Sequence, residues 1–384
     1  MRGFDSHLSS IVKPYYFSIV EWEFKTLLGG EKQSDPAGIV EDELGQVIQY
    51  FSLVERRNDL ESEMKAINNS DRTGDLASLE TEFNTLEAQR VALEDDVRKI
   101  ITNQIKEALV EQNIFNPVDK YIRLRVGFPP VNFRLEQPPY LLVISPRDRI
   151  ESIREVTLVQ NLSVAEMEYI EANVDPLGVS SLVVELGGFG GTYPTFVVND
   201  ASLQFTLDTA TEEWLHQYLT LRPLGFLYLL DRIGAAKNYD IATMNETVAG
   251  IVSKEIGGIV YEKHYSQRED GGNQSQGVGP GFDFNREMRE IRKTVDAYLA
   301  QGEIEQAETF MEERRQFLIS NGYYIRKLNQ AYFAFHGTYA DQPTSISPIG
   351  QELKQLRSQS DSLKDFLDTV AVMTSHQDLF DSIK

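Results

Sequence analysis

Two glutamates and a histidine stand close together in the segment SLQFTLDTATEEWLHQYL, residues 202–219. Glu212 and His216 are four residues apart, so in a helix both side chains project from one face, one turn apart. Glu213 is adjacent to Glu212. Carboxylate oxygens and imidazole nitrogens bind zinc and similar cations, and a carboxylate beside such a cation can take a proton from water. The spacing therefore indicates a metal-binding face on this helix.

A third ligand has to come from another helix, and the segment MNETVAGIVSKEIGG, residues 244–258, offers Glu246. Three small residues follow it along one helical stripe, at spacings of 4, 3 and 4: Gly250, Ser253 and Gly257. Small residues on a stripe let a helix approach another backbone closely. We expect this helix to pack against the helix at 209–221, which would bring Glu246 to the first two ligands.

The two segments resemble the gluzincin metallopeptidases, whose H-E-x-x-H helix is completed by a glutamate in an N-E-x-x-A helix. Here the first motif reads E-E-x-x-H, with Glu212 in place of the first histidine. Asn245, Glu246 and Ala249 match the second motif. The resemblance covers about residues 180–265, and the whole layout also resembles an uncharacterised bacterial family.

The resemblance implies one zinc ion held by Glu212, His216 and Glu246, with Glu213 as the general base that takes a proton from water. Two carboxylates and one imidazole make a harder and more negative site than two imidazoles and one carboxylate. Manganese therefore becomes more competitive with zinc, and the alternative is that no ion binds.

The substrate that the resemblance implies is a peptide or a protein. A Gly-rich loop, Gly187–Gly191, precedes the strand TYPTFVV at 192–198. In the superfamily that the chain resembles, an edge strand ahead of the active helix pairs with the substrate by backbone hydrogen bonds. We expect the peptide to lie along this part of the chain.

The aromatic segment 322–339 supplies further candidates. The peptidases that the chain resembles use a Tyr or His to support the oxyanion, and we assign this role to Tyr332 and His336, with Tyr339 as a third candidate. Arg326 could hold a substrate carboxylate. Packing in a core is the competing interpretation of the aromatic residues.

The elements that must position these residues indicate an α+β fold. We predict a zincin-like strand layer with a helical catalytic part, plus an antiparallel helical hairpin of coiled-coil type. Composition and Pro/Gly breaks divide the chain into five parts: an N-terminal arm at 1–38, the hairpin at 39–115, a β-rich substrate-side subdomain at 116–208, a helical active-site subdomain at 209–345 and a C-terminal helix or two at 346–384.

Period-two alternation predicts the strands of the β-rich part: Tyr121–Val126, Tyr140–Ile144, Glu155–Val159, Leu182–Glu185, Thr195–Val198 and Leu203–Leu207. Asp208 or Thr209 would then cap the active-site helix. Residues 163–173 are predicted to form a short helix, with Ser163 as its N-cap. The N-terminal arm is predicted to be extended and packed on the body.

The hairpin is predicted from apolar residues at alternating spacings of 4 and 3 in 39–68 and in about 76–110, with Arg90 at one seam position. A polar break, NNSDRTGD, separates the two helices. The hairpin is either a scaffold lying on the body or a projecting arm for homo-oligomerisation or partner docking.

Composition excludes several classes of function. The net charge of −22 repels nucleic-acid phosphates and anionic lipid headgroups. Zero cysteines exclude disulfides, thiolate zinc sites and cysteine nucleophiles. No segment has the apolar length of a membrane span, so direct membrane insertion is not expected. We expect a bacterial extracytoplasmic protein, or one tethered through a segment outside this chain, with a cytoplasmic location as the alternative.

The leading hypothesis is a metal-dependent peptidase or a protein derived from one. The alternative is a non-catalytic, peptidase-like interaction or scaffold protein that uses the hairpin for partner or self association. A di-metal carboxylate oxidase needs paired Glu-x-x-His motifs on separate helices, and the chain offers only Glu213-x-x-His216.

Overall fold

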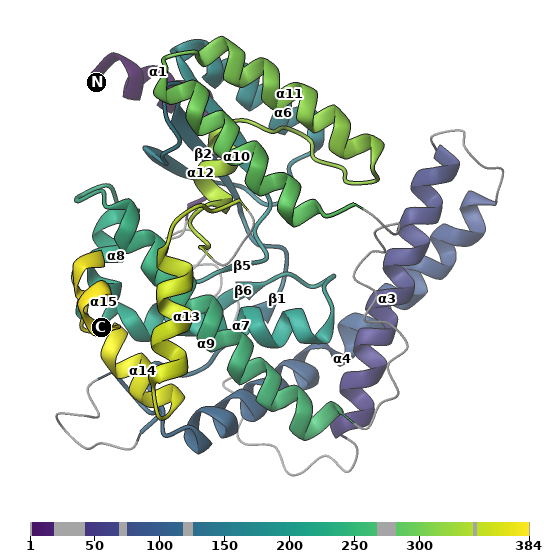
Figure 1. The fold of residues 1–384 in the computed structure, drawn as a ribbon. Helices are drawn as coiled ribbons and strands as arrows, with labels where there is room; N and C mark the ends of the chain where they lie inside the picture. Colours follow the sequence, from purple (N-terminus) through teal and green to yellow (C-terminus); the bar gives the residue numbers. More distant parts are fainter. Residues whose placement is uncertain are drawn as a thin grey trace.

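The computed structural model of the protein describes residues 2–18, 43–68, 75–117, 126–266, 282–340 and 344–383. Within these ranges the chain is mixed α+β and mostly helical, with two small three-stranded sheets (Figure 1). The predicted α+β class is therefore confirmed. None of the helices in these ranges combines the length and the apolar character that crossing a membrane requires.

The first sheet is antiparallel, in the order β3 (Arg154–Leu158), β2 (Tyr140–Pro146), β4 (Val179–Val184). Alternate side chains of β2 enter two different apolar clusters, because successive residues of a strand point to opposite faces. One face is covered by α1 (Arg2–Val12) and α6 (Val164–Val174), and the other by α12 (Gln330–His336). This sheet is therefore buried on both faces.

The second sheet has the order β1 (Phe133–Leu135), β6 (Thr195–Val197), β5 (Gly188–Phe189). β1 runs parallel to β6, whereas β5 runs antiparallel to it. The segment TYPTFVV thus supplies the central strand, and the Gly-rich loop before it forms the edge strand. The edge strand β5 lies beside α7 (Leu203–Thr220), the helix that carries Glu212 and His216.

Four of the predicted strands are confirmed as β2, β3, β4 and β6, with ends that differ by up to three residues. The predicted strand Tyr121–Val126 lies outside the described residues except for its last residue. The short helix at 163–173 is confirmed as α6, with Ser163 and Glu166 forming a reciprocal capping box. The N-terminal arm packs on the body as predicted, but its first part is the helix α1 and is not extended. Its residues 19–38 lie outside the described ranges.

The prediction of a strand at Leu203–Leu207 is wrong, because these residues begin α7. Leu203 and Leu207 are buried, whereas Phe205 between them is 43% exposed. Apolar residues at alternate positions are typical of a strand, but here only Leu203 and Leu207, which are four residues apart as in a helix, face the core. The Ser202 side chain accepts a hydrogen bond from the Phe205 N–H and caps the helix, so the predicted caps at 208 and 209 are also wrong.

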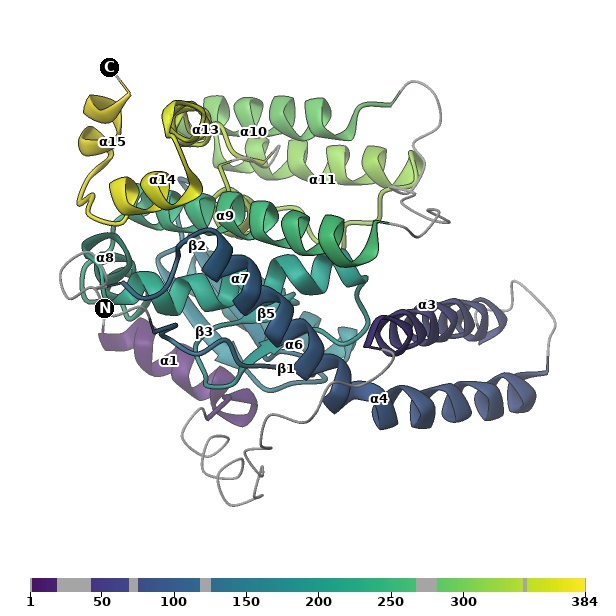
Figure 2. The ribbon, with the colours of Figure 1, turned by 90° about the horizontal axis from the view of Figure 1, so that it is seen from below.

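The helix α9 (Tyr239–Tyr265) runs through the centre of the protein, and every residue from Ile241 to Gly250 is buried. It packs along α7, whose other side meets β5 and β6, so α7 lies between α9 and the second sheet (Figure 2). A Cβ added at Gly257 would lie 2.0 Å from Asp208 Oδ1 of α7, whereas one added at Gly250 would meet nothing within 4 Å. Of the predicted small-residue stripe, Gly257 marks the close approach and Gly250 does not.

The helices α3 (Glu43–Asn68) and α4 (Leu76–Glu111) form an antiparallel pair that projects from one side of the body (Figures 1 and 2). Arg90 is buried between them and donates to the hydroxyl of Tyr50 and to the carboxylates of Glu87 and Glu94. The second half of α4 continues into the main core of the body. A coiled-coil role in self-association stays a prediction.

The remaining helices cover the body. The pair α10 (Phe284–Ala300) and α11 (Ile304–Ser320) is joined by a turn with Gly302 at φ +77°. The C-terminal part contains α13 (Ile349–Gln359), α14 (Leu363–Val370) and α15 (His376–Ser382), which is one helix more than predicted. The helix α8 (Pro223–Arg232) links α7 to α9.

The close contact of α9 with α7 can be tested with two alanine substitutions. Gly257→Ala should lower the free energy of unfolding by about 1–3 kcal/mol, because the new methyl group overlaps Asp208. Gly258→Ala is the matched control on the same helix, where a Cβ meets nothing within 4 Å. It should raise the free energy of unfolding by up to about 1 kcal/mol through helix propensity. The free energies are measured by urea unfolding, and equal changes in the two variants would contradict the close contact at Gly257.

Candidate metal centre

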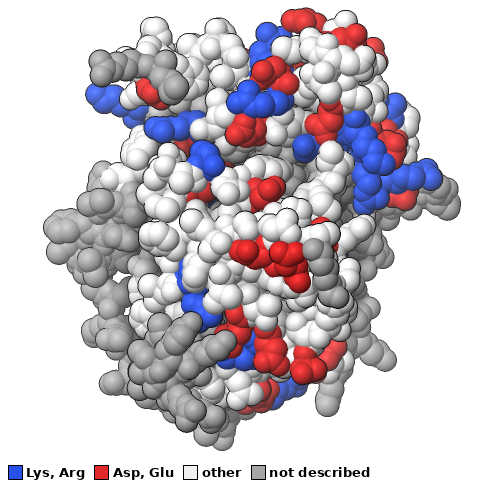
Figure 3. All heavy atoms as spheres, turned by 60° about the vertical axis from the view of Figure 1, so that its left-hand side comes forward, with Lys and Arg blue, Asp and Glu red and all other residues white. Residues whose placement is uncertain are grey.

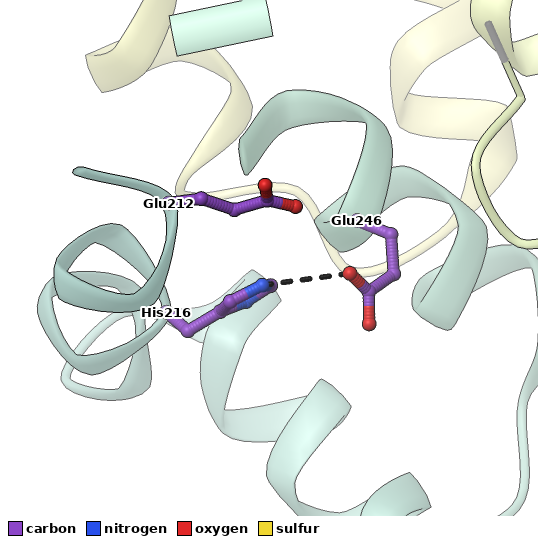
Figure 4. Close-up of side chains that lie close together, drawn as sticks. All are labelled: Glu212, His216 and Glu246. Carbon is purple, nitrogen blue, oxygen red and sulfur yellow. Dashed lines mark ion pairs between the residues drawn. The ribbon is translucent and has the colours of Figure 1, made fainter. Parts of the chain in front are cut away.

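The crossing of α7 and α9 brings together the three predicted ligands. One ligand atom each from Glu212, His216 and Glu246 lies within 4.8 Å of the other two (Figure 4). His216 Nε2 is 3.4 Å from Glu246 Oε2. The three side chains point toward a common space, with Glu212 and His216 from α7 and Glu246 from α9. The sequence predicted this meeting, whereas metal binding itself stays a prediction.

Neighbouring groups hold the far atom of two of these side chains. Asn245 Oδ1 is 2.8 Å from His216 Nδ1, and the hydroxyl of Tyr228 donates to Glu246 Oε1 at 2.5 Å. By contrast, Glu212 Oε1 and Glu246 Oε2 are buried without a hydrogen-bond partner among the described residues. Unpaired buried acceptors are unfavourable, and a cation with oxygen and nitrogen ligands would satisfy them.

Charge at the centre is unevenly distributed. Burial raises the pKa of Glu212 to about 8. Burial would also raise the pKa of Glu246, but His216 and the Tyr228 hydroxyl lower it to about 2. Burial would lower the pKa of His216, but Glu246 raises it to about 9. Without a cation, His216 and Glu246 therefore form a buried ion pair, and an imidazolium neutralises the charge of the carboxylate.

Glu213 lies against the edge strand β5 and the loop that follows it. A Cβ added at Gly188 would lie 2.4 Å from Glu213 Oε1, and one at Gly190 would lie 2.6 Å from Glu213 Oε2. Burial raises the pKa of Glu213 to about 7, although a hydrogen bond from the Gly190 backbone opposes the shift. The glycines of this loop are thus required where a carboxylate approaches the backbone closely. Gln217, one turn further along α7, donates to the Thr192 carbonyl and fixes the same loop.

The structure does not bring Tyr332 and His336 to the centre. Both lie on α12, with ring centroids 4.3 Å apart, and Tyr332 packs against the first sheet. Burial alone raises the pKa of Tyr332 to about 12 and lowers that of His336 to about 4. Among the described residues, no hydrogen bond, ion pair or ring contact joins either side chain to the three ligands. Tyr332 is held by its packing on the sheet, and no contact among the described residues supports the assignment of either side chain to the centre.

The proposed role of Arg326 is also corrected. Its guanidinium donates to both carboxylate oxygens of Glu171, at 2.9 and 2.6 Å, and to the carbonyl of Val183 at 2.9 Å. These bonds tie the loop before α12 to α6 and β4. Arg326 is therefore part of the framework and is not free to hold a substrate.

Tyr339 is the aromatic residue of this segment that lies near the centre. Burial raises its pKa, and the nearby charges of Glu246 and Glu212 raise it further. Tyr339 and Glu246 line a cavity of about 40 Å³ together with Tyr228 and Arg232 of α8. The sequence interpretation missed both α8 residues. Their spacing of four places them on one helix face, but nothing in the local sequence connects that face to a glutamate on α9.

The half-buried His336 predicts a pH-dependent stability. The unfolded chain binds a proton near the ordinary pKa of 6.5, whereas the folded protein does so only near 4. Stability is therefore lost as the pH falls from 6.5 toward 4. Because the ring is partly exposed, we expect His336→Asn to reduce the loss of unfolding free energy between pH 7 and 4.5 by roughly 1–2 kcal/mol. The free energy of unfolding is measured by urea unfolding at each pH. The exposed control His7→Asn should show the same pH dependence of this free energy as the unsubstituted protein. The same pH dependence in all three proteins would contradict the prediction.

Comparisons with protein-family models, with curated proteins and with solved structures give no match for this chain. The function must therefore be argued from the geometry of the centre. That geometry consists of three convergent ligand groups, one carboxylate oxygen of Glu212 without a hydrogen-bond partner among the described residues, and the carboxylate of Glu213 beside the edge strand β5.

Proposed function

We propose that the protein is a metal-dependent peptidase or a close derivative of one, with a divalent cation held by Glu212, His216 and Glu246. The observation that carries the proposal is the convergence of these three groups within 4.8 Å, with Glu212 Oε1 buried without a hydrogen-bond partner among the described residues. The likeness to gluzincins, and to a zincin strand layer with an active-site helix, belongs to the same proposal.

The donor set suits the cation. One imidazole and two carboxylates are ligands that zinc accepts, and the second carboxylate makes manganese competitive. A cation bound there would supply Lewis acidity toward a peptide carbonyl and toward water. Glu212 Oε1, which has no hydrogen-bond partner among the described residues, and Glu246 Oε2, which faces His216, are the two acceptors that fit this requirement.

The chain itself supplies the remaining functions. Glu213 lies beside Glu212 on α7 and next to β5, where it can take a proton from water and return it to the leaving amine. The edge strand β5 would align a peptide by backbone hydrogen bonds. Tyr339, in place of Tyr332 and His336, is the phenol that would support the oxyanion.

One observation favours the alternative of a non-catalytic interaction protein. The outer side of α8 exposes apolar side chains, with Phe226 52%, Leu229 40% and Ile233 65% exposed. On the face that Figure 3 shows, uncharged side chains cover broad areas between interspersed acidic and basic groups. Exposed apolar surface of this kind is typical of protein contacts. In this reading the ion pair of His216 and Glu246 fills the centre and no cation binds.

Metal content decides whether the centre binds a cation. Protein purified without chelator should contain about one equivalent of zinc or manganese by elemental analysis. His216→Ala should lose that metal, because only two carboxylate ligands remain. His264→Ala is the matched control, since His264 lies near the end of the same α9 helix that carries Glu246 but pairs with Glu107 of α4. Equal metal in the unsubstituted protein and in His216→Ala would contradict the site.

Glu213→Gln separates catalysis from metal binding. The variant should keep its metal but lose about 10²–10⁴-fold in peptide cleavage, because the amide cannot accept the proton. The exposed Glu262→Gln on α9 should leave cleavage unchanged. Cleavage of a peptide library, with zinc, manganese or cobalt supplied, is the measurement. Absence of cleavage by a metal-loaded protein would favour the interaction protein, and full activity of Glu213→Gln would exclude this base.

A further inference from the structure

Tyr228 of α8 touches two of the three groups at the centre, although its helix supplies no ligand. Its hydroxyl donates to Glu246 Oε1 at 2.5 Å. Its ring stacks on the imidazole of His216, with centroids 5.4 Å apart and planes 20° apart. A single side chain therefore restrains both the glutamate from α9 and the histidine from α7.

These contacts turn the near atoms of both ligands toward each other. With Oε1 held by the phenol, Glu246 presents Oε2, which makes no hydrogen bond and lies 3.4 Å from His216 Nε2. Asn245 Oδ1 holds Nδ1 of the imidazole, so the ring presents Nε2. Groups that bind the far atom of a metal ligand fix the orientation of the near one.

The helix that carries Tyr228 is itself anchored at both ends. Arg232, one turn after Tyr228, forms an ion pair with Glu155 of β3. At the other end, the Leu224 N–H donates to the Ala371 carbonyl at 3.2 Å. The helix that carries the phenol is thus tied to the first sheet and to the C-terminal helices, in addition to its packing on α7 and α9.

We propose that Tyr228 is a positioning residue for a divalent cation: it holds Glu246 and His216 in the orientation in which Oε2 and Nε2 face the same ion. The inference rests on the proposed function and adds to it a residue outside the two motif helices. Tyr228 acts through the ligands and does not itself touch the substrate. Removing its hydroxyl leaves the ring stacking in place but frees the carboxylate of Glu246 to rotate.

The test is isothermal titration of metal-free protein with zinc chloride at one fixed pH. Tyr228→Phe should weaken zinc binding by about 10–100-fold, as is typical for loss of a hydrogen bond to a metal ligand. Tyr239→Phe is the matched control, because Tyr239 lines the same cavity while its phenol interacts with Arg292 and Thr243. Its dissociation constant should stay within about 3-fold of the unsubstituted value.

The outcomes separate the two proposals. If the unsubstituted protein binds no zinc, the proposed function fails. If it binds zinc and Tyr228→Phe binds equally or more tightly, the positioning role fails and the metal centre stands. Thermal melting of the metal-free variants identifies a purely structural role: a lower melting temperature for Tyr228→Phe with an unchanged dissociation constant would overturn the inference. A loss of affinity in Tyr239→Phe as large as that in Tyr228→Phe would overturn it as well.

Discussion

The close packing of α9 against α7 is the contact on which the rest of the structure depends. At Gly257 the absence of a side chain leaves room for Asp208 of α7. The same two helices carry the candidate ligands, so the separation between α7 and α9 also sets the distance between Glu246 and His216. The centre is therefore part of the core and is as rigid as its packing.

Three glutamate side chains and one histidine are buried at this crossing, and the surrounding groups neutralise only part of their charge. His216 neutralises Glu246, and the Tyr228 hydroxyl holds one oxygen of that carboxylate. Burial keeps the pKa of Glu212 and Glu213 high, because the loss of hydration outweighs the nearby positive charge of His216. The proposed divalent ion would bring a charge and a ligand preference that fit this arrangement.

Both sheets contribute to the centre, although neither supplies a candidate ligand. The second sheet presents β5 and its glycines to Glu213. The first sheet anchors α8 through the ion pair of Glu155 with Arg232, which places Tyr228 against Glu246. The candidate base and the positioning phenol thus approach the ligands from different sheets.

The sequence determined the features that depend on local spacing. These are the pairing of Glu212 with His216 on one helix face, the cap at Ser163 and the stripe that ends at Gly257, because helix period and capping are set by neighbours in the chain. Only the tertiary structure decided which distant groups meet. Tyr228 reached the centre while Tyr332 and His336 did not, because long-range packing of α8 and α12 places them, and spacing along the chain carries no record of that packing.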